Sequence, residues 1–151
     1  MTRANILLVD GTCIFCNRIV TFILRHDRKA LFHFAHLQSS FGRATLERHG
    51  RDPNDVDRIC LLVDEGTAHE RLLVDGEAGR VIWPALFRGA VILRWVPLPI
   101  LNVFYRVFAR YRYRLFGKYD SCRVPSAEER ERFIAGSVSN ARPEPLTRVA
   151  V

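Results

Sequence analysis

The sequence lacks a long apolar segment near its N-terminus. Only Ile6–Val9 are apolar before Asp10, whereas the apolar core of a secretory signal peptide spans roughly 7–15 residues. The longest apolar stretch, residues 81–109, is interrupted by prolines and arginines, so it falls short of the roughly 20 residues that a transmembrane helix needs. We therefore expect neither a signal peptide nor a membrane span, and a cytoplasmic location.

Lysine is scarce, and the cysteines are too few for a disulfide framework. Lys29 and Lys118 are the only lysines, so arginine supplies nearly all of the positive charge behind a net charge of +7 and a pI of about 9.8. Such an excess attracts anionic partners in general but selects none of them. Thiols in the cytoplasm are mostly kept reduced, and a Cys-x-x-Cys pair in that setting is typical of catalysis or metal binding.

The chain of 151 residues fits one domain, and its 48% hydrophobic composition can supply a core. Repeats and low-complexity segments are absent. Apolar runs and alternation predict strands at residues 6–9, 31–37 and 59–63, with an edge strand at 70–74. Helical spacing predicts one helix at about 13–25 and a second from 39 or 40 to 49. It also predicts a helix before the segment VPLP, another after it at about 100–115, and a short one at 127–134. We expect Thr12 to cap the first helix, Gly50 to end the second, and residues 137–151 to form a flexible tail.

Cys13 and Cys16 lie where the first predicted strand ends and the first predicted helix begins. Free N–H groups and partial positive charge at a helix N-terminus favour a thiolate, so we expect the pKa of Cys13 to fall toward neutrality. Cys16 lies on the same helix face, within reach for a disulfide. Cys13 would attack a substrate disulfide, and Cys16 would resolve the mixed disulfide. Asp10 is a candidate proton carrier for Cys16, or a turn-former bound to the amides of residues 11 and 12.

Two other interpretations of the cysteine pair stay open: metal binding and inert packing. A closed zinc site needs four ligands, often from two separated pairs, and this chain has one such pair. Cys60 falls in a predicted buried strand, where a small apolar role is expected, and the histidines supply no matching second pair. The metal interpretation that remains is a carrier that binds a soft metal through these two cysteines alone. GTCIFC is similar to the Gly-Met-Thr-Cys-x-x-Cys loop of heavy-metal-associated domains, although the methionine is absent.

The helix predicted at about 100–115 interleaves aromatic and basic residues. We favour an interpretation in which its Phe and Tyr side chains pack on the domain while its arginines reach water. The alternative is weak contact with an anionic partner or a membrane surface, through Arg106, Arg110, Arg112 and Arg114. Nucleic-acid motifs are otherwise missing, so no specific nucleic acid is predicted.

Several separated segments together resemble the DCC family of thiol-disulfide oxidoreductases, which is named for an Asp and two Cys. The segment DGTCIFC supplies these three residues as Asp10, Cys13 and Cys16. Further agreement, in the same order along the chain, is found at Asp27, in the FxFAxLQS stretch at Phe32–Ser39 and in RYRLFGKYDSC at Arg112–Cys122. The likeness covers nearly the whole chain.

This resemblance implies a thioredoxin-like α/β domain over residues 1–136, a strand-helix-strand start with a central sheet and a helical C-terminal half. It implies thiol–disulfide exchange with a protein or small-thiol substrate, recycled by an external reductant and without a bound cofactor. It also makes Cys122 a candidate auxiliary thiol, against the alternative of a packing residue. Two features depart from the expected pattern. Asp75 and Gly79 stand near positions where a serine and an alanine are usual, and no proline directly precedes residues 59–63, where thioredoxin-like enzymes generally place a cis-proline.

Overall fold

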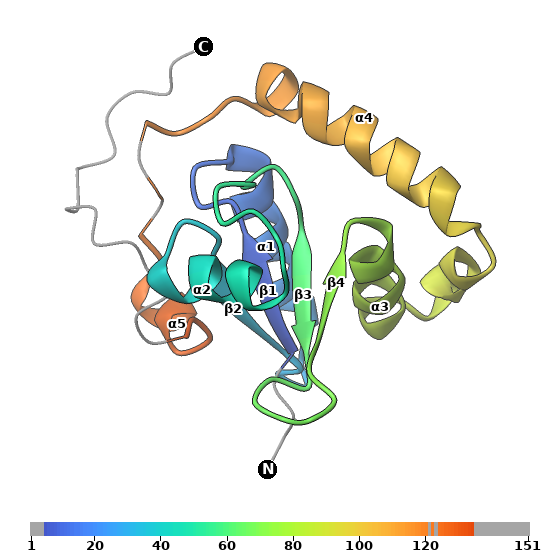
Figure 1. Ribbon diagram of the computed structural model, residues 1–151, viewed down its shortest axis with the longest axis horizontal. Coiled ribbons are helices and arrows are strands. Elements are labelled where there is room, and N and C mark those ends of the chain that lie inside the picture. The colour runs from blue at the N-terminus through green and yellow to red at the C-terminus, as the bar shows by residue number, and fades with distance from the viewer. Residues whose placement is uncertain (1–4, 121, 123, 135–151) are drawn as a thin grey trace.

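In the computed structural model, strands and helices alternate through the first half of the chain and helices dominate the second half (Figure 1). The structure describes residues 5–120, 122 and 124–134, so the predicted tail at 137–151 lies outside the described residues. The strands are β1 (Asn5–Val9), β2 (Phe32–His36), β3 (Cys60–Val63) and β4 (Arg71–Val74). The α-helices are α1 (Ile14–His26), α2 (Ser40–Arg48), α3 (Gly76–Leu86), α4 (Leu98–Phe116) and α5 (Ala127–Arg130), and a 3-10 helix, η1, spans Arg88–Arg94.

The four strands form one mixed sheet in the order β2-β1-β3-β4. β1 pairs in parallel with β2, and the connection between them is α1. β3 pairs antiparallel with β1 and also with β4, which is an edge strand as predicted. This topology, with helices packed on both faces, confirms the predicted thioredoxin-like α/β arrangement and places the end of β1 in the middle of the sheet.

β1 is buried on both faces of the sheet because helices cover each of them. Leu7 and Val9 pack with α1 and α3 side chains in one apolar cluster. Ile6 and Leu8 point the other way and pack with Leu46 of α2 in a second cluster. The continuous apolar run in the sequence is therefore the signature of a two-sided strand, and the strand delivers Asp10 and the residues after it to the top of the sheet.

α1 begins one residue later than predicted. Cys13, not Thr12, is the N-cap residue, with an extended backbone conformation and a side chain that accepts from the N–H of Cys16. At the other end, the carboxylate of Asp27 accepts the N–H groups of Leu31 and Phe32 at 3.0 and 2.9 Å. Asp27 thus organises the turn from α1 into β2, which explains the acidic residue in the family-like segment.

The second half of the chain differs in detail from the prediction. The single helix expected before VPLP is two elements, α3 and η1, with Pro84 inside α3. The break at VPLP is confirmed, since Pro97 precedes α4 and fixes an extended turn there. The helix predicted at 127–134 is shorter, ending at Arg130. Figure 1 shows α4 crossing the end of the sheet at which β1 stops and α1 starts.

The helices of the described chain are short or polar compared with a membrane span. Within residues 5–120, 122 and 124–134, no single helix has the length and apolar character needed to cross a membrane. η1 and α4 reach that length and apolar character only when taken together, and they are bent by 108° at the break between them.

Candidate redox site

Cys13 is held as an acceptor of hydrogen bonds at the start of α1. Its Sγ atom lies 3.3 Å from the backbone nitrogen of Cys16, whose N–H donates to it. Hydrogen bonding from the Cys16 thiol is the largest influence on Cys13, and together with that N–H it outweighs burial and lowers the pKa of Cys13 to about 7. The pKa of Cys16 is raised, because its thiol donates to Cys13 and is partly withdrawn from water. The pair is therefore asymmetric, with the thiolate at Cys13.

Asp10 lies buried beside the pair, directly after β1. Its Oδ1 atom accepts from the backbone and hydroxyl of Thr12 at 2.9 and 2.7 Å and from Gln38 at 2.5 Å, and its Oδ2 atom accepts from the hydroxyl of Tyr113. Burial opposes ionisation of Asp10, but these hydrogen bonds prevail and lower its pKa. Asp10 is therefore a fixed negative charge at neutral pH. Of the two amides predicted to bind it as a turn-former, that of Thr12 does so, whereas that of Gly11 donates to Oε1 of Gln38.

Arg112 of α4 supplies the balancing positive charge. It is 1% exposed, and its Nη2 atom lies 3.5 Å from Oδ2 of Asp10 and 3.2 Å from Oδ1 of Asp57. Its Nη1 atom donates to the carbonyl of Asp57 at 3.0 Å, and its charge helps to lower the pKa of Cys13. The prediction that Arg112 belongs with the anion-contacting arginines is wrong, because the acidic groups around it draw this one guanidinium inside.

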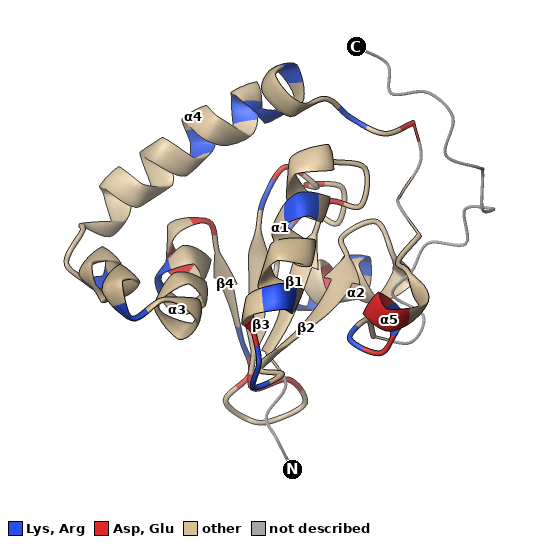
Figure 2. Ribbon diagram, turned by 180° about the vertical axis from the view of Figure 1, so that it is seen from behind, with Lys and Arg blue, Asp and Glu red and all other residues tan. Residues whose placement is uncertain are grey.

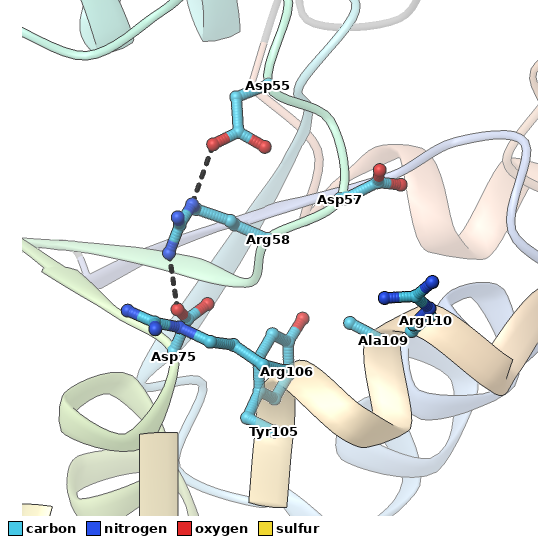
Figure 3. A pocket seen from close by; sticks show the side chains of 8 residues that line it. All are labelled: Asp55, Asp57, Arg58, Asp75, Tyr105, Arg106, Ala109 and Arg110. Atoms are coloured by element: carbon cyan, nitrogen blue, oxygen red, sulfur yellow. Dashed lines mark hydrogen bonds and ion pairs between the residues drawn. The ribbon is translucent and has the colours of Figure 1, made fainter. Parts of the chain in front are cut away.

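A pocket of about 300 Å³ opens on the other side of Asp57, between the loop before β3 and α4 (Figure 3). Arg58 bridges two of the carboxylates that line it, at 2.6 Å from Asp55 and 2.6 Å from Asp75. Asp75 is the N-cap residue of α3, with φ of 53° and no capping bond from its side chain. This bridge ties the loop to the start of α3 and so fixes Asp57 where it holds Arg112.

The Cys13 side chain is covered by the end of α4 and the residues after it. Cys13 forms an isolated antiparallel bridge with Lys118, and the N–H of Tyr119 donates to the carbonyl of Thr12 at 2.8 Å. Phe15 packs between two rings of α4, with its centroid 4.8 Å from those of Phe108 and Phe116. Cys13 is consequently 0% exposed, whereas Cys16 is partly exposed.

The two other cysteines have different surroundings. Cys122 lies close to the site, since a Cβ atom built on Gly11 would fall 3.0 Å from its Sγ atom. Burial raises the pKa of Cys122, so it is a protonated thiol at neutral pH. Cys60 is in the apolar cluster on the α2 face, as predicted, and burial raises its pKa to about 12. All four cysteines are free thiols in this structure.

Metal ligands do not gather around the pair. Across the described part of the chain, no group of three or more His, Cys, Asp or Glu side chains is arranged to hold a metal ion. A closed tetrahedral site therefore has no candidate ligand set among these residues.

Four residues of the site were not identified from the sequence: Gln38, Asp57, Arg112 as a buried cation, and Tyr113. Gln38 and the adjacent pair Arg112 and Tyr113 fall inside the two segments that carried the family resemblance, so those segments marked the right places without revealing a role. Nothing in the sequence around Asp57 indicated a role at the site, because it is one of several polar residues in a loop. Their contacts join Asp10 to residues 28 to 103 positions away along the chain.

Comparison with known proteins shows the family to which this chain belongs. The family model for DCC1-like thiol-disulfide oxidoreductases matches residues 7–118. The uncharacterized protein YuxK of Bacillus subtilis is 31% identical over 130 residues, which cover 86% of this chain and 93% of that protein. A chloroplastic DCC family protein of Arabidopsis thaliana is 34% identical over 129 residues, covering 81% of this chain and 70% of that protein. No solved structure matches significantly. The matched span and these relatives show that the chain belongs to the DCC1-like thiol-disulfide oxidoreductase family.

Proposed function

We propose that this protein carries out thiol–disulfide exchange, with Cys13 as the nucleophile and Cys16 as the resolving thiol. The observation that carries the assignment is the asymmetry of the pair. The Sγ atom of Cys13 accepts from the N–H of Cys16 at 3.3 Å, and the pKa of Cys13 is lowered to about 7 while that of Cys16 is raised. A thiolate whose pKa lies near the ambient pH combines ionisation with nucleophilicity.

The reaction proceeds in two exchanges. The Cys13 thiolate attacks one sulfur of the substrate disulfide, and the other sulfur leaves as a thiolate that takes up a proton. Cys16 then loses its proton and attacks the Cys13 sulfur of the mixed disulfide, which releases the second substrate thiol. The substrate has gained two electrons and two protons, and the protein holds a Cys13–Cys16 disulfide. An external dithiol reductant of either protein or small-molecule type returns the pair to its reduced state.

Asp10 and Arg112 would act on the pair through charge. Arg112 favours the Cys13 thiolate and Asp10 opposes it, so these two charges make smaller adjustments to a pKa that hydrogen bonding from Cys16 mainly lowers. The lowered pKa of Asp10 makes it a weak base, which supports a positioning role over the proton-carrier role predicted from the sequence. Cys122, beside Gly11, would be an auxiliary thiol that acts only after deprotonation.

The rival function is a two-coordinate soft-metal carrier that uses Cys13 and Cys16. Thiol trapping across a graded dithiol/disulfide buffer separates the two. Exchange chemistry predicts reversible formation of a Cys13–Cys16 disulfide with one midpoint, abolished in Cys13→Ser. A pair that never oxidises, in protein that retains stoichiometric copper or zinc after purification, would establish the metal function instead. Cys60→Ser is the matched control, because Cys60 lies in the core away from the pair.

A further inference from the structure

The outer face of α4 is apolar and exposed. Side chains spaced three or four residues apart form a continuous stripe along the helix, and each of them is between 46% and 73% exposed. This apolar stripe consists of Ile100, Val103, Phe104, Val107, Tyr111 and Leu115. The opposite face carries Phe108, Arg112 and Phe116, which cover the redox site. The stripe is therefore spare surface that the domain does not use for its own core.

The apolar surface continues beyond α4. Val91 and Ile92 of η1 are 44% and 70% exposed, and Trp95, at the bend between η1 and α4, is 84% exposed. Exposed tryptophan at a bend is unusual for a side chain that gains so much from burial. The stripe and this neighbouring patch lie on consecutive elements.

Positive charge is concentrated in the same segment. Residues 78–119 contain eight Arg or Lys and no Asp or Glu, so they carry +8, whereas the whole chain carries +7. The remainder of the chain, with 15 basic and 16 acidic residues, therefore carries −1. Figure 2 shows basic residues on α4 and η1 without acidic ones. The basic excess of this protein thus belongs to the segment that presents the apolar stripe.

Three arginines follow the stripe along one side. Arg106, Arg110 and Arg114 are spaced four residues apart and are exposed. None of them has a hydrogen bond or ion pair with another residue of the described chain, in contrast to the buried Arg112. Arg106 and Arg110 also line the pocket that contains the acidic residues (Figure 3), and Arg114 does not. Guanidinium groups beside an apolar face can reach anionic headgroups while the helix lies at the level of the upper acyl chains.

We infer that the α4 stripe and the Trp95 patch dock on the surface of an anionic lipid bilayer, with α4 lying in the plane of the interface. An apolar face, an interfacial tryptophan and a row of unpaired arginines together fit such a surface. Nucleic acid would satisfy the arginines but would leave isoleucine, valine and phenylalanine in water. A second copy of this chain would cover the stripe but would bring more unpaired positive charge toward it. The docked protein would hold its redox pair close to the membrane surface.

Trp95 provides a direct test. In the full chain with Trp83→Phe, Trp95 is the only tryptophan, so its fluorescence reports its own surroundings. Vesicles of phosphatidylcholine with phosphatidylglycerol should shift its emission to the blue at low salt, and brominated acyl chains should quench it. Vesicles of phosphatidylcholine alone should bind much more weakly. Phe104→Asp should abolish the shift. Arg110→Gln and Arg114→Gln should each weaken binding about fivefold, and Arg43→Gln, which changes an exposed arginine on α2, should leave it unchanged.

Several outcomes would overturn the inference. A folded protein, checked by circular dichroism, that shows no shift or quenching with anionic vesicles at low salt does not dock on such a surface. Equal binding to neutral and anionic vesicles would remove the role of the arginines. A concentration-dependent dimer in sedimentation velocity that Phe104→Asp dissociates, without vesicle binding, would assign the stripe to a second copy. Because none of these measurements involves Cys13 or Cys16, failure of the docking leaves the proposed redox function untouched.

Discussion

The Sγ atom of Cys13 accepts a hydrogen bond from the backbone N–H of Cys16 at 3.3 Å, so one redox cysteine caps the helix that carries the other. A side-chain acceptor at the N-cap position satisfies one of the free N–H groups of the first turn. A thiolate does this better than a thiol, because the end of the helix also carries partial positive charge. One hydrogen bond therefore both caps α1 and stabilises the thiolate of Cys13.

The pKa of Cys13 can be measured directly and depends on its neighbour Cys16. Its thiolate absorbance near 240 nm should titrate with a midpoint of about 7 and should disappear in Cys13→Ser. Because hydrogen bonding from the Cys16 thiol is the largest influence on that pKa, Cys16→Ala should raise the midpoint toward the usual value of about 8.5. Cys16→Ser keeps a donor and should stay closer to the wild type. Equal midpoints in the two Cys16 variants would contradict this assignment.

Arg112→Gln tests the buried charge. Removing the guanidinium leaves Asp10 buried without its ion pair, and breaking such a pair costs about 3–5 kcal/mol of unfolding free energy. The midpoint of Cys13 should rise at the same time, because Arg112 helps to lower it. Urea unfolding and thiolate titration measure the two effects. The exposed Arg114→Gln should change the unfolding free energy by less than about 0.5 kcal/mol, and a similar loss in both variants would show that burial of Arg112 is not the cause.

Asp10→Asn separates a positioning role from proton transfer. The charge of Asp10 raises the pKa of Cys13, so the variant should lower the Cys13 midpoint. If Asp10 only positions its neighbours, the rate at which Cys16 resolves a mixed disulfide should change little in a single-turnover assay. A loss of about 100-fold or more in that rate would instead identify Asp10 as the proton carrier.

The same variant has a pH signature in stability. The pKa of Asp10 is lowered in the folded protein, so its ionisation stabilises the fold at pH values above the unfolded pKa of about 3.9. That contribution is lost as the pH falls through the folded pKa. The difference in unfolding free energy between the wild type and Asp10→Asn should therefore be larger at pH 7 than at pH 3. A difference that does not depend on pH would point to lost shape complementarity rather than charge.

Two glycines give a matched test of the packing. A Cβ atom on Gly42 would clash with the carbonyl oxygen of His36 and lie 2.7 Å from that of Leu37, so Gly42→Ala forces α2 away from β2 and should destabilise the protein by about 1–3 kcal/mol. Gly79, where the family resemblance expects alanine, has only Trp83 side-chain atoms near its Cβ position, at 3.7 Å or more. Gly79→Ala should stabilise α3 by about 0.5–1 kcal/mol. Chemical denaturation of both variants checks the opposite signs.

The sequence predicted what depends on local pattern and missed what depends on tertiary contact. β1 and α1 were predicted because a two-sided strand and an amphipathic helix each leave a periodic signature. The burial of Arg112 was missed because an arginine looks the same on either face of a helix until its partners are known. Those partners, Asp10 and Asp57, are 102 and 55 residues away in sequence. The pattern did not define where the helix before VPLP begins, and Asp75 at its N-cap neither caps by its side chain nor has a usual N-cap conformation.

The cover over Cys13 must open before a substrate can reach its sulfur. A nucleophile that is 0% exposed meets its substrate only when the cover opens, and local opening is governed by the packing that holds it. Phe108 anchors α4 to α1 through Phe15, so Phe108→Ala should speed alkylation of Cys13 by a bulky maleimide. A loss of about 1–2 kcal/mol in that anchor corresponds to a rate increase of 5-fold to 30-fold.

The rate comparison is made at a pH where Cys13 is fully ionised in every variant, so that access is measured and not ionisation. Phe104→Ala is the control, because Phe104 lies on the same helix but is 73% exposed and faces away from the pair. It should leave the alkylation rate unchanged. If Phe108→Ala also leaves that rate unchanged, the cover over Cys13 opens by a route other than release of α4, with the bridge between Cys13 and Lys118 as the next candidate.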